Sequence, residues 1–217
     1  MKFDKEALRE ALLLYAVTDR AWLGELTLAQ QVEASLRGGA TMVQLREKHL
    51  DRAAFRSEAL ELGALCRRCH VPFLVNDDVE LALEAGADGV HVGQEDLEAG
   101  QARARLGPDR LLGVSAHTVE QALRAQRAGA DYLGVGAVFP TGTKGDAGVL
   151  SLDTLRDICA AVDIPVVAIG GIGGHNIHKL AGCGVCGVAV VSALFAQPDV
   201  EAAARALRAA ARKIVTR

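Results

Sequence analysis

Short apolar runs recur along the whole chain, and longer stretches of mixed character lie between most of them. The runs lack strict alternation of apolar and polar residues, which is expected of parallel strands that are covered on both faces. They predict eight strands, at Leu13–Val17, Met42–Leu45, Pro72–Val75, Gly89–Val92, Leu111–Val114, Tyr132–Val135, Val166–Ile169 and Gly187–Val191. Regular alternation of such strands with other elements is typical of α/β proteins.

The intervening stretches place apolar residues three and four positions apart, which predicts helices with one buried face. Examples are Leu26–Arg37, Ala53–Cys69, Val119–Ala128 and Leu152–Val162. A last helix, predicted over Val200–Ile214, closes the chain.

A short motif of glycine, alanine and then Thr or Asp precedes three of the strands. It begins at Gly39, Gly86 and Gly129, and Gly184 opens a looser fourth copy. We expect each glycine to end a helix in the left-handed region, so that a strand starts three residues later. With 217 residues and eight strands, a βα unit has about 27 residues, near the lower limit for such a crossover. We therefore predict one (β/α)8 TIM barrel domain over residues 1–217, with a doubly wound open sheet as the alternative.

Composition and charge narrow the possible functions. Hydrophobic residues make up 50% of the chain and charged residues 24%, and the formal net charge is -3, so no general nucleic-acid binder is expected. Anionic ligands then require a local group of cations. The N-terminus has no apolar signal segment, and the longest apolar stretch, Val185–Ala196, is too short to span a bilayer. We expect a cytoplasmic protein without a membrane partner.

Five cysteines include two Cys-x-x-Cys patterns, at Cys66–Cys69 and Cys183–Cys186. The first continues into His70 and so matches the haem-attachment pattern, but covalent haem requires export. The two pairs are too far apart in sequence for a common zinc-finger spacing. We interpret these cysteines as reduced thiols that pack as small apolar side chains.

In a barrel, active residues lie just after the strands. Helix capping alone explains Asp78 and Thr118. It does not explain why three cations and two further carboxylates share this end of the barrel. The polar segments found there are Gln44–Lys48, Asn76–Asp78, His91–Asp96, Ser115–Thr118, Phe139–Lys144, Gly170–Gly174 and Ser192.

Two of these groups have a readable chemistry. Gly170–Gly174 is interpreted as a backbone N–H nest for an anion that leads into a helix N-terminus, and Ser192 adds a hydroxyl beside it. Asp77 and Asp96 follow adjacent strands and are either Mg²⁺ ligands or an acid/base pair. The nearby cations favour the metal, because Mg²⁺ commonly bridges phosphates. No pattern for a covalent nucleophile is found, and His91 and the other histidines have no assigned role.

These ordered motifs closely resemble those of the thiamine-phosphate synthase family. The resemblance extends from Tyr15 to the final helix, and several motifs in order are more specific than any one of them. They are Tyr15–Arg20, Gln44–Lys48, Asn76–Asp77, Gly93–Asp96, Gly113–His117, Pro140–Lys144, Gly170–Ile172 and Val191–Ser192.

The resemblance implies a (β/α)8 transferase that joins a pyrimidine to a thiazole. The thiazole phosphate takes the methylene of 4-amino-2-methyl-5-(diphosphooxymethyl)pyrimidine, which gives thiamine phosphate and releases diphosphate. It also implies roles by motif position. The pyrimidine diphosphate would be bound by Gln44, Leu45, Arg46, Glu47, Lys48, Asn76, Ser115 and Lys144. Arg46, Ser115 and Lys144 would be catalytic, and Asp77 and Asp96 would hold Mg²⁺. The thiazole phosphate would be bound by Thr141, Gly142, Thr143, Gly171, Val191 and Ser192.

Three alternatives remain open at this point. A thiazole tautomerase shares the barrel and the thiazole-phosphate end but does not need the cations and carboxylates. A sugar-phosphate epimerase would have different residues after the strands. A non-catalytic binding barrel would not require the carboxylates and cations found there. The segment Gly145–Leu150 is also shorter than is often found in the family, which would alter closure over the substrates. The sequence does not specify an oligomeric state.

Overall fold

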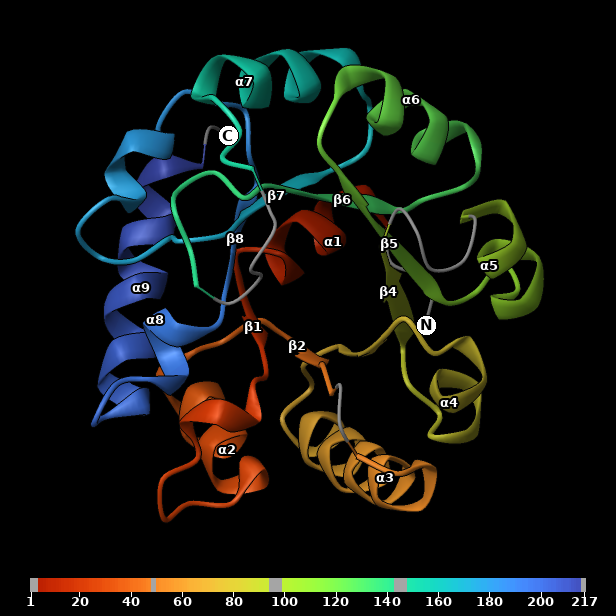
Figure 1. Cartoon of the computed structure of the whole chain (residues 1–217), viewed down its shortest axis with the longest axis vertical. Helices are drawn as coiled ribbons and strands as arrows, with labels where there is room; N and C mark the ends of the chain where they lie inside the picture. The colour runs from red at the N-terminus through yellow and green to blue at the C-terminus, as the bar shows by residue number, and fades with distance from the viewer. Residues whose placement is uncertain (1–3, 48–49, 94–98, 143–147, 216–217) are drawn as a thin grey trace.

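Eight parallel strands close into a barrel in chain order, β1 to β8, in a computed structural model that describes residues 4–47, 50–93, 99–142 and 148–215 (Figure 1). Closure of the sheet confirms the predicted TIM barrel and excludes the doubly wound open sheet. Seven of the eight predicted strands match the structure to within one residue at each end, and the fifth is two residues longer than predicted. The strands are β1 Leu14–Val17, β2 Met42–Leu45, β3 Phe73–Asn76, β4 Gly89–Val92, β5 Leu111–Ala116, β6 Tyr132–Val135, β7 Val166–Ile169 and β8 Gly187–Val190.

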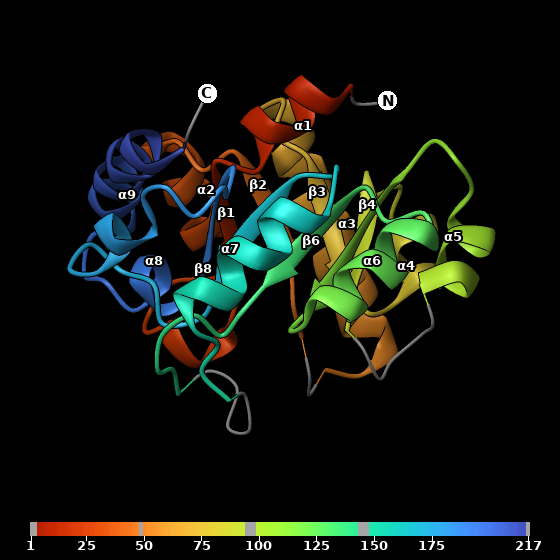
Figure 2. The ribbon, with the colours of Figure 1, turned by 90° about the horizontal axis from the view of Figure 1, so that it is seen from above.

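Helices surround the barrel on its outside (Figures 1 and 2). The ring consists of α2 Leu28–Gly38, α3 Arg52–Arg68, α4 Val79–Glu84, α5 Ala99–Leu106, α6 Val119–Arg127, α7 Leu152–Ala161 and α9 Val200–Ile214. Shorter elements complete the described chain: the 3-10 helices η1 Arg20–Trp22 and η2 Ile177–Leu180, and the one-turn helix α8 Ser192–Phe195. None of the helices in these ranges has the length and apolarity needed to cross a membrane.

A short helix that sequence patterning did not predict, α1 Lys5–Ala11, lies across the end of the barrel where the strands begin (Figures 1 and 2). Asp4 caps it by accepting a hydrogen bond from the Ala7 N–H at 2.7 Å. Leu8, Ala11 and Leu12 are buried and pack with residues of the barrel interior. This end of the barrel is therefore filled by apolar side chains, which leaves the opposite end for ligands.

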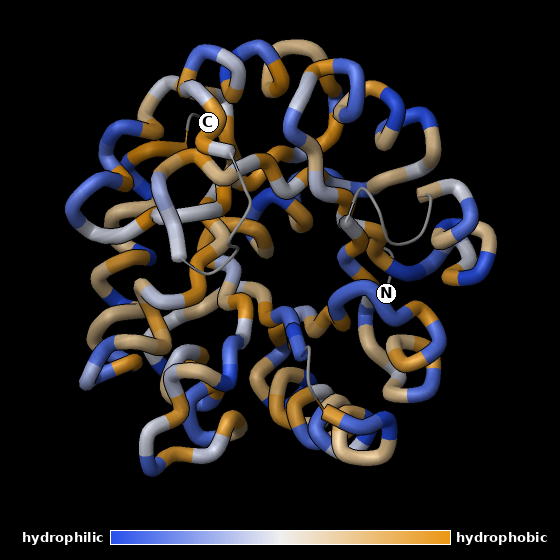
Figure 3. Tube along the Cα trace, in the orientation of Figure 1, coloured by the Kyte–Doolittle hydropathy of each residue, from blue (hydrophilic) through white to orange (hydrophobic). Residues whose placement is uncertain are grey.

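Side chains along each strand alternate between two cores, and Figure 3 shows the strands as mostly hydrophobic. Leu14 and Ala16 pack outward against the helices, whereas Tyr15 and Val17 face the interior. By the same alternation, the inward side chains near the carboxyl ends of four neighbouring strands are polar. They are Gln44 of β2, Asn76 of β3, His91 of β4 and Ser115 of β5.

The glycine motif has the structure that the sequence predicts. Its glycines all have positive φ, between 63° at Gly86 and 102° at Gly39. The third residue of the motif then caps a neighbouring strand: Asp88 accepts from Phe73 N–H at 2.9 Å and Asp131 from Leu112 N–H at 2.7 Å. The motif thus fixes the end of the barrel opposite the candidate site.

Candidate active site at the carboxyl ends of the strands

The predicted site residues that the structure describes lie at the carboxyl end of the barrel, which we call the rim. Glu47, Asn76 and Asp77 line a hollow of about 480 Å³, together with Phe55 and residues of α4. These three residues come from the ends of β2 and β3, which are hydrogen-bonded neighbours. The structure therefore brings the first two predicted polar segments to one place.

The segment after β2 is held by β1. The Arg46 N–H donates to the hydroxyl of Thr18 at 2.9 Å, and Thr18 itself is fully buried. Arg46 Nη2 is shielded from solvent and has no hydrogen-bond partner among the residues that the structure describes. Leu45 is buried in the outer core, so its side chain faces the helices. A buried guanidinium nitrogen without an acceptor is costly, and an anion at the rim would supply the acceptor.

Glu47 is a carboxylate in a segment assigned to an anionic ligand, and its partner explains its presence. Arg20 Nε donates to Glu47 Oε1 at 3.1 Å, and the same guanidinium pairs with Glu58 of α3. The Glu47 side chain is only 4% exposed, and burial raises its pKa although Arg20 opposes the shift. Glu47 thus anchors the segment after β2 to η1 and, through Arg20, to α3. Its carboxylate is paired with Arg20 and serves a structural role.

Asp77 is placed by the backbone as much as by its neighbours. Its φ is +62°, in the left-handed region that Asp and Asn adopt more readily than most residues. Its N–H donates to the carbonyl of His91 at 2.8 Å, and its Oδ1 accepts from Gly93 N–H at 3.3 Å. The side-chain amide of Asn76 donates to Oδ2. The carboxylate therefore joins the ends of β3 and β4.

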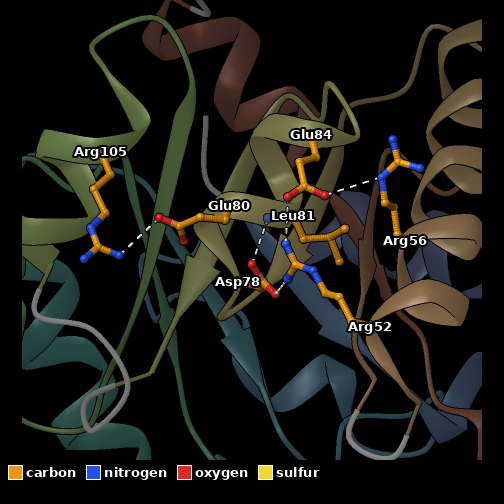
Figure 4. A network of polar contacts seen from close by, with 7 residues as sticks. All are labelled: Arg52, Arg56, Asp78, Glu80, Leu81, Glu84 and Arg105. Atoms are coloured by element: carbon orange, nitrogen blue, oxygen red, sulfur yellow. Dashed lines mark hydrogen bonds and ion pairs between the residues drawn. The ribbon is translucent and has the colours of Figure 1, made fainter.

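Asp78, the next residue, belongs to a separate structural network (Figure 4). It caps α4 by accepting from Leu81 N–H at 2.8 Å and pairs with Arg52. Arg52 and Arg56 also pair with Glu84, at 3.0 and 3.4 Å. This confirms the prediction that helix capping explains Asp78, and it separates two adjacent carboxylates by role.

Ser115 is joined to a line of polar side chains that sequence reasoning missed. His91 Nε2 lies 3.1 Å from Ser115 Oγ, and His91 Nδ1 lies 3.0 Å from the Tyr132 hydroxyl. Tyr132 contacts the Tyr15 hydroxyl at 2.9 Å, and Gln44 Nε2 donates to Tyr15 at 2.6 Å. The line crosses the barrel interior from β2 to β5. Its sequence signal is weak, because each member is a single polar residue within an apolar run.

The predicted thiazole-phosphate residues lie on the other side of the rim, after β6, β7 and β8. The loops after β6 and β7 are packed together: a Cβ at Gly171 would lie 2.4 Å from the Pro140 carbonyl oxygen, so only glycine allows this approach. Thr141 and Gly142 follow directly. Val191 and Ser192 come after β8, and Ser192 opens the one-turn helix α8. The five predicted residues that the structure describes on this side are partly or fully exposed, namely Thr141, Gly142, Gly171, Val191 and Ser192.

The glycine segment after β7 leads into a helix, as expected. This helix is the 3-10 helix η2, which has only four residues. Asn176 is the reason, because its side chain ties the loop to itself. Its Oδ1 accepts from Gly173 N–H and its Nδ2 donates to the Gly171 carbonyl, both at 2.8 Å. The Gly173 N–H is therefore already hydrogen-bonded within the loop. The four residues of η2 are also too few for a helix dipole to attract an anion here.

Part of the predicted site lies outside the described residues. Lys48, Asp96, Thr143 and Lys144 belong to the undescribed ranges 48–49, 94–98 and 143–147. Each range follows directly on a described rim residue, namely Glu47, Gly93 or Gly142. The positions of these four side chains stay predictions.

The cysteines are thiols within the fold. All five are free, and Cys66, Cys183 and Cys186 are buried, as expected of small apolar side chains. Cys69 departs from that expectation because it is exposed. Burial raises the pKa of Cys66 and Cys186 to about 12.

The closed eight-stranded barrel, with polar side chains gathered at the carboxyl ends of its strands, has the architecture of a (β/α)8 barrel enzyme. The family model described as thiamine monophosphate synthase matches residues 14–194. The chain belongs to this family of transferases, which confirms the resemblance drawn from the motifs.

Individual members of the family are similar to this chain over most of their length. The thiamine-phosphate synthase of Chloroflexus aurantiacus is 52% identical over 197 residues, which cover 90% of this chain and 91% of that protein. That of Ruminiclostridium cellulolyticum is 47% identical over 194 residues, covering 89% and 92%. The structure of thiamine phosphate pyrophosphorylase from Pyrococcus furiosus superposes with a TM-score of 0.89 at 39% identity, covering 96% of this chain and 100% of that one. These matches favour the synthase over the tautomerase alternative.

Proposed function

We propose that the rim joins the methylene of 4-amino-2-methyl-5-(diphosphooxymethyl)pyrimidine to the nitrogen of the thiazole phosphate, with Mg²⁺ as cofactor. The products are thiamine phosphate and diphosphate. The observation that carries this assignment of the site is the shielded Nη2 of Arg46, which has no hydrogen-bond partner among the described residues; Arg46 directly precedes Glu47, which lines the hollow with Asn76 and Asp77. Family membership supports the assigned reaction, and the position of Arg46 supports the rim as the place where the diphosphate binds.

The diphosphate end is assigned to the β2–β5 side of the rim. Arg46 presents a guanidinium whose backbone is fixed by Thr18, which suits bidentate binding of phosphate oxygens. Lys48 and Lys144 would add charge from the segments that follow Glu47 and Gly142. Ser115 would donate its hydroxyl to an oxygen of the same group. The pyrimidine would lie deeper, against Gln44 and Asn76, which face the barrel interior.

Asp77 and Asp96 are the proposed Mg²⁺ ligands, and what the structure describes fits that role. The Asp77 carboxylate is exposed and lies at the rim, where Asn76 and the Gly93 N–H donate hydrogen bonds to it and fix its position. Asp96 follows Gly93, the donor to Asp77, by three residues in the sequence. Hard carboxylate oxygens suit Mg²⁺, which when bound would neutralise charge on the diphosphate.

The thiazole phosphate is assigned to the β6–β8 side. Thr141 and Thr143 would supply hydroxyl donors, and Gly142 and Gly171 allow the backbone to approach a phosphate closely. Ser192 would add a hydroxyl, and the first N–H groups of α8 have no partner within that helix. The two anions would thus bind on opposite sides of the barrel mouth, with the reacting carbon between them.

Catalysis then consists of leaving-group stabilisation and positioning. The methylene–oxygen bond breaks with its electron pair going to diphosphate, and the lone pair of the thiazole nitrogen forms the new carbon–nitrogen bond. Arg46, Lys48 and Lys144 meet the negative charge as it develops on diphosphate. Holding the thiazole phosphate across the mouth places the nitrogen next to the methylene. The reaction requires no side-chain nucleophile.

The test is diphosphate release by the purified protein with both substrates and Mg²⁺, with each component omitted in turn. Release that requires all three supports the proposal. Absence of release with all three present would contradict the synthase function, and conversion of a thiazole isomer without the pyrimidine would indicate a tautomerase.

A further inference from the structure

The polar line inside the barrel fixes the direction of each of its hydrogen bonds. Gln44 donates from Nε2, so the Tyr15 oxygen accepts and the Tyr15 hydrogen must go elsewhere. Among the described residues, the other hydrogen-bond partner of that hydroxyl is Tyr132, at 2.9 Å, so Tyr15 donates to Tyr132. Tyr132 in turn has His91 Nδ1 at 3.0 Å as the acceptor for its own hydrogen. A nitrogen that accepts carries no proton, so the ring proton of His91 lies on Nε2.

We infer that Tyr132 holds His91 in its Nε2–H tautomer, so that His91 donates to Ser115 and the Ser115 hydrogen is directed to an acceptor other than His91. A proton on Nδ1 would reverse the line, and the Tyr15 hydrogen would then face the amide nitrogen of Gln44. In the complex proposed above, the acceptor for Ser115 is a diphosphate oxygen. His91 and Tyr132 are therefore positioning residues for Ser115, and this last step rests on the proposed function.

The surroundings are shaped to keep this line intact. A Cβ at Gly113 would lie 2.2 Å from Cζ of Tyr132 and 2.5 Å from Nδ1 of His91, so β5 carries glycine where both rings pass. Gly134 of β6 leaves similar room, since a Cβ there would lie 3.0 Å from Cε1 of His91. Burial raises the pKa of both tyrosines, which keeps their hydroxyls protonated and able to donate.

The direct test is nitrogen NMR of ligand-free protein labelled with ¹⁵N-histidine. The chain has six histidines, and the His91 signals are identified by their loss in His91→Gln. We expect Nδ1 of His91 to have the shift of an unprotonated acceptor and Nε2 that of a protonated nitrogen. A proton on Nδ1 in the wild-type protein would overturn the inference. This measurement needs no substrate, so it is independent of whether the protein releases diphosphate.

Two matched variants distinguish positioning from packing. Tyr132→Phe and Tyr15→Phe each remove one buried hydroxyl from the same line. Tyr132→Phe removes the donor to His91, so we expect its signals to shift toward an average of both tautomers and kcat to fall about tenfold with little change in KM. In Tyr15→Phe, Tyr132 still has His91 as its acceptor, so the tautomer is retained. Equal changes of the His91 signals in both variants, or none in Tyr132→Phe, would overturn the inference. If Tyr132→Phe fails to fold, the wild-type spectrum alone decides.

Discussion

Tyr15 and Tyr132, the two tyrosines of the chain, lie 117 positions apart in sequence and meet hydroxyl to hydroxyl at 2.9 Å inside the barrel. Their rings meet edge to face, with centroids 6.0 Å apart and an interplanar angle of 69°. Both side chains are almost fully buried, so their hydroxyls depend on protein partners. The pair links β1 to β6 across the interior and joins Gln44 to His91.

Because each hydroxyl satisfies the other, their contributions to stability are coupled. Tyr15→Phe or Tyr132→Phe alone leaves a buried polar partner without its bond, and we expect each to lower the free energy of unfolding by about 1–3 kcal/mol. The double variant removes both hydroxyls, so its loss should fall short of the sum by roughly 1 kcal/mol. Urea unfolding of the four proteins measures this difference. Strict additivity would show that the two hydroxyls do not interact.

Arg46 should be needed for activity but not for folding. Its Nη2 is buried without a partner among the described residues, so Arg46→Met should not lower the free energy of unfolding. The same change removes a cation from the leaving group, and we expect kcat to fall about 100- to 1,000-fold. Steady-state kinetics at saturating substrates, together with urea unfolding, check both expectations.

Arg52 provides the control for charge near the rim. It pairs with Asp78 and Glu84, so its charge is already balanced within the network of Figure 4. Arg52→Met should leave kcat within about twofold of the wild-type value. Ion pairs at the surface contribute little to stability, and Arg52 has no proposed contact with the reacting atoms. A loss of turnover as large as that of Arg46→Met would mean that general charge at this end, and not Arg46, is required.

The barrel could be predicted from sequence because its strands are continuous apolar runs and its helices have one apolar face. Helix α1 was missed because its seven residues carry only a short apolar pattern, although Asp4 marks its start. A helix after Gly170–Gly174 was predicted, but its short 3-10 form was not, because the hydrogen bonds of Asn176 to the loop depend on three-dimensional contacts. Motifs identified Gln44 and Ser115, but not His91, because its partners lie 24 and 41 positions away.

The cysteines should differ sharply in reactivity. Burial raises the pKa of Cys66, Cys159 and Cys186 to about 12, so at pH 8 only about one such thiol in ten thousand is ionised. Cys69 is exposed at the end of α3. In the native protein a thiol-specific disulfide reagent should therefore modify Cys69 first, and all five thiols only after unfolding. Persistence of the fast phase in Cys69→Ser would contradict this ordering.

Asp77 and Asp78 allow the metal proposal to be tested by the same change at adjacent positions. Asp77→Asn keeps a residue that tolerates the positive φ but removes the charge offered to Mg²⁺. We expect the Mg²⁺ concentration for half-maximal diphosphate release to rise at least about tenfold.

Asp78→Asn removes a charge one residue away, where the carboxylate caps α4 and pairs with Arg52. Asparagine caps helices about as well as aspartate, so the free energy of unfolding should change by less than about 1 kcal/mol. Because the Asp78 side chain points to α4 and not to β4, diphosphate release by Asp78→Asn should depend on the Mg²⁺ concentration as in the wild-type protein. Similar Mg²⁺ titrations for the two variants would show that bulk negative charge at the rim, and not the Asp77 carboxylate between β3 and β4, holds the cation.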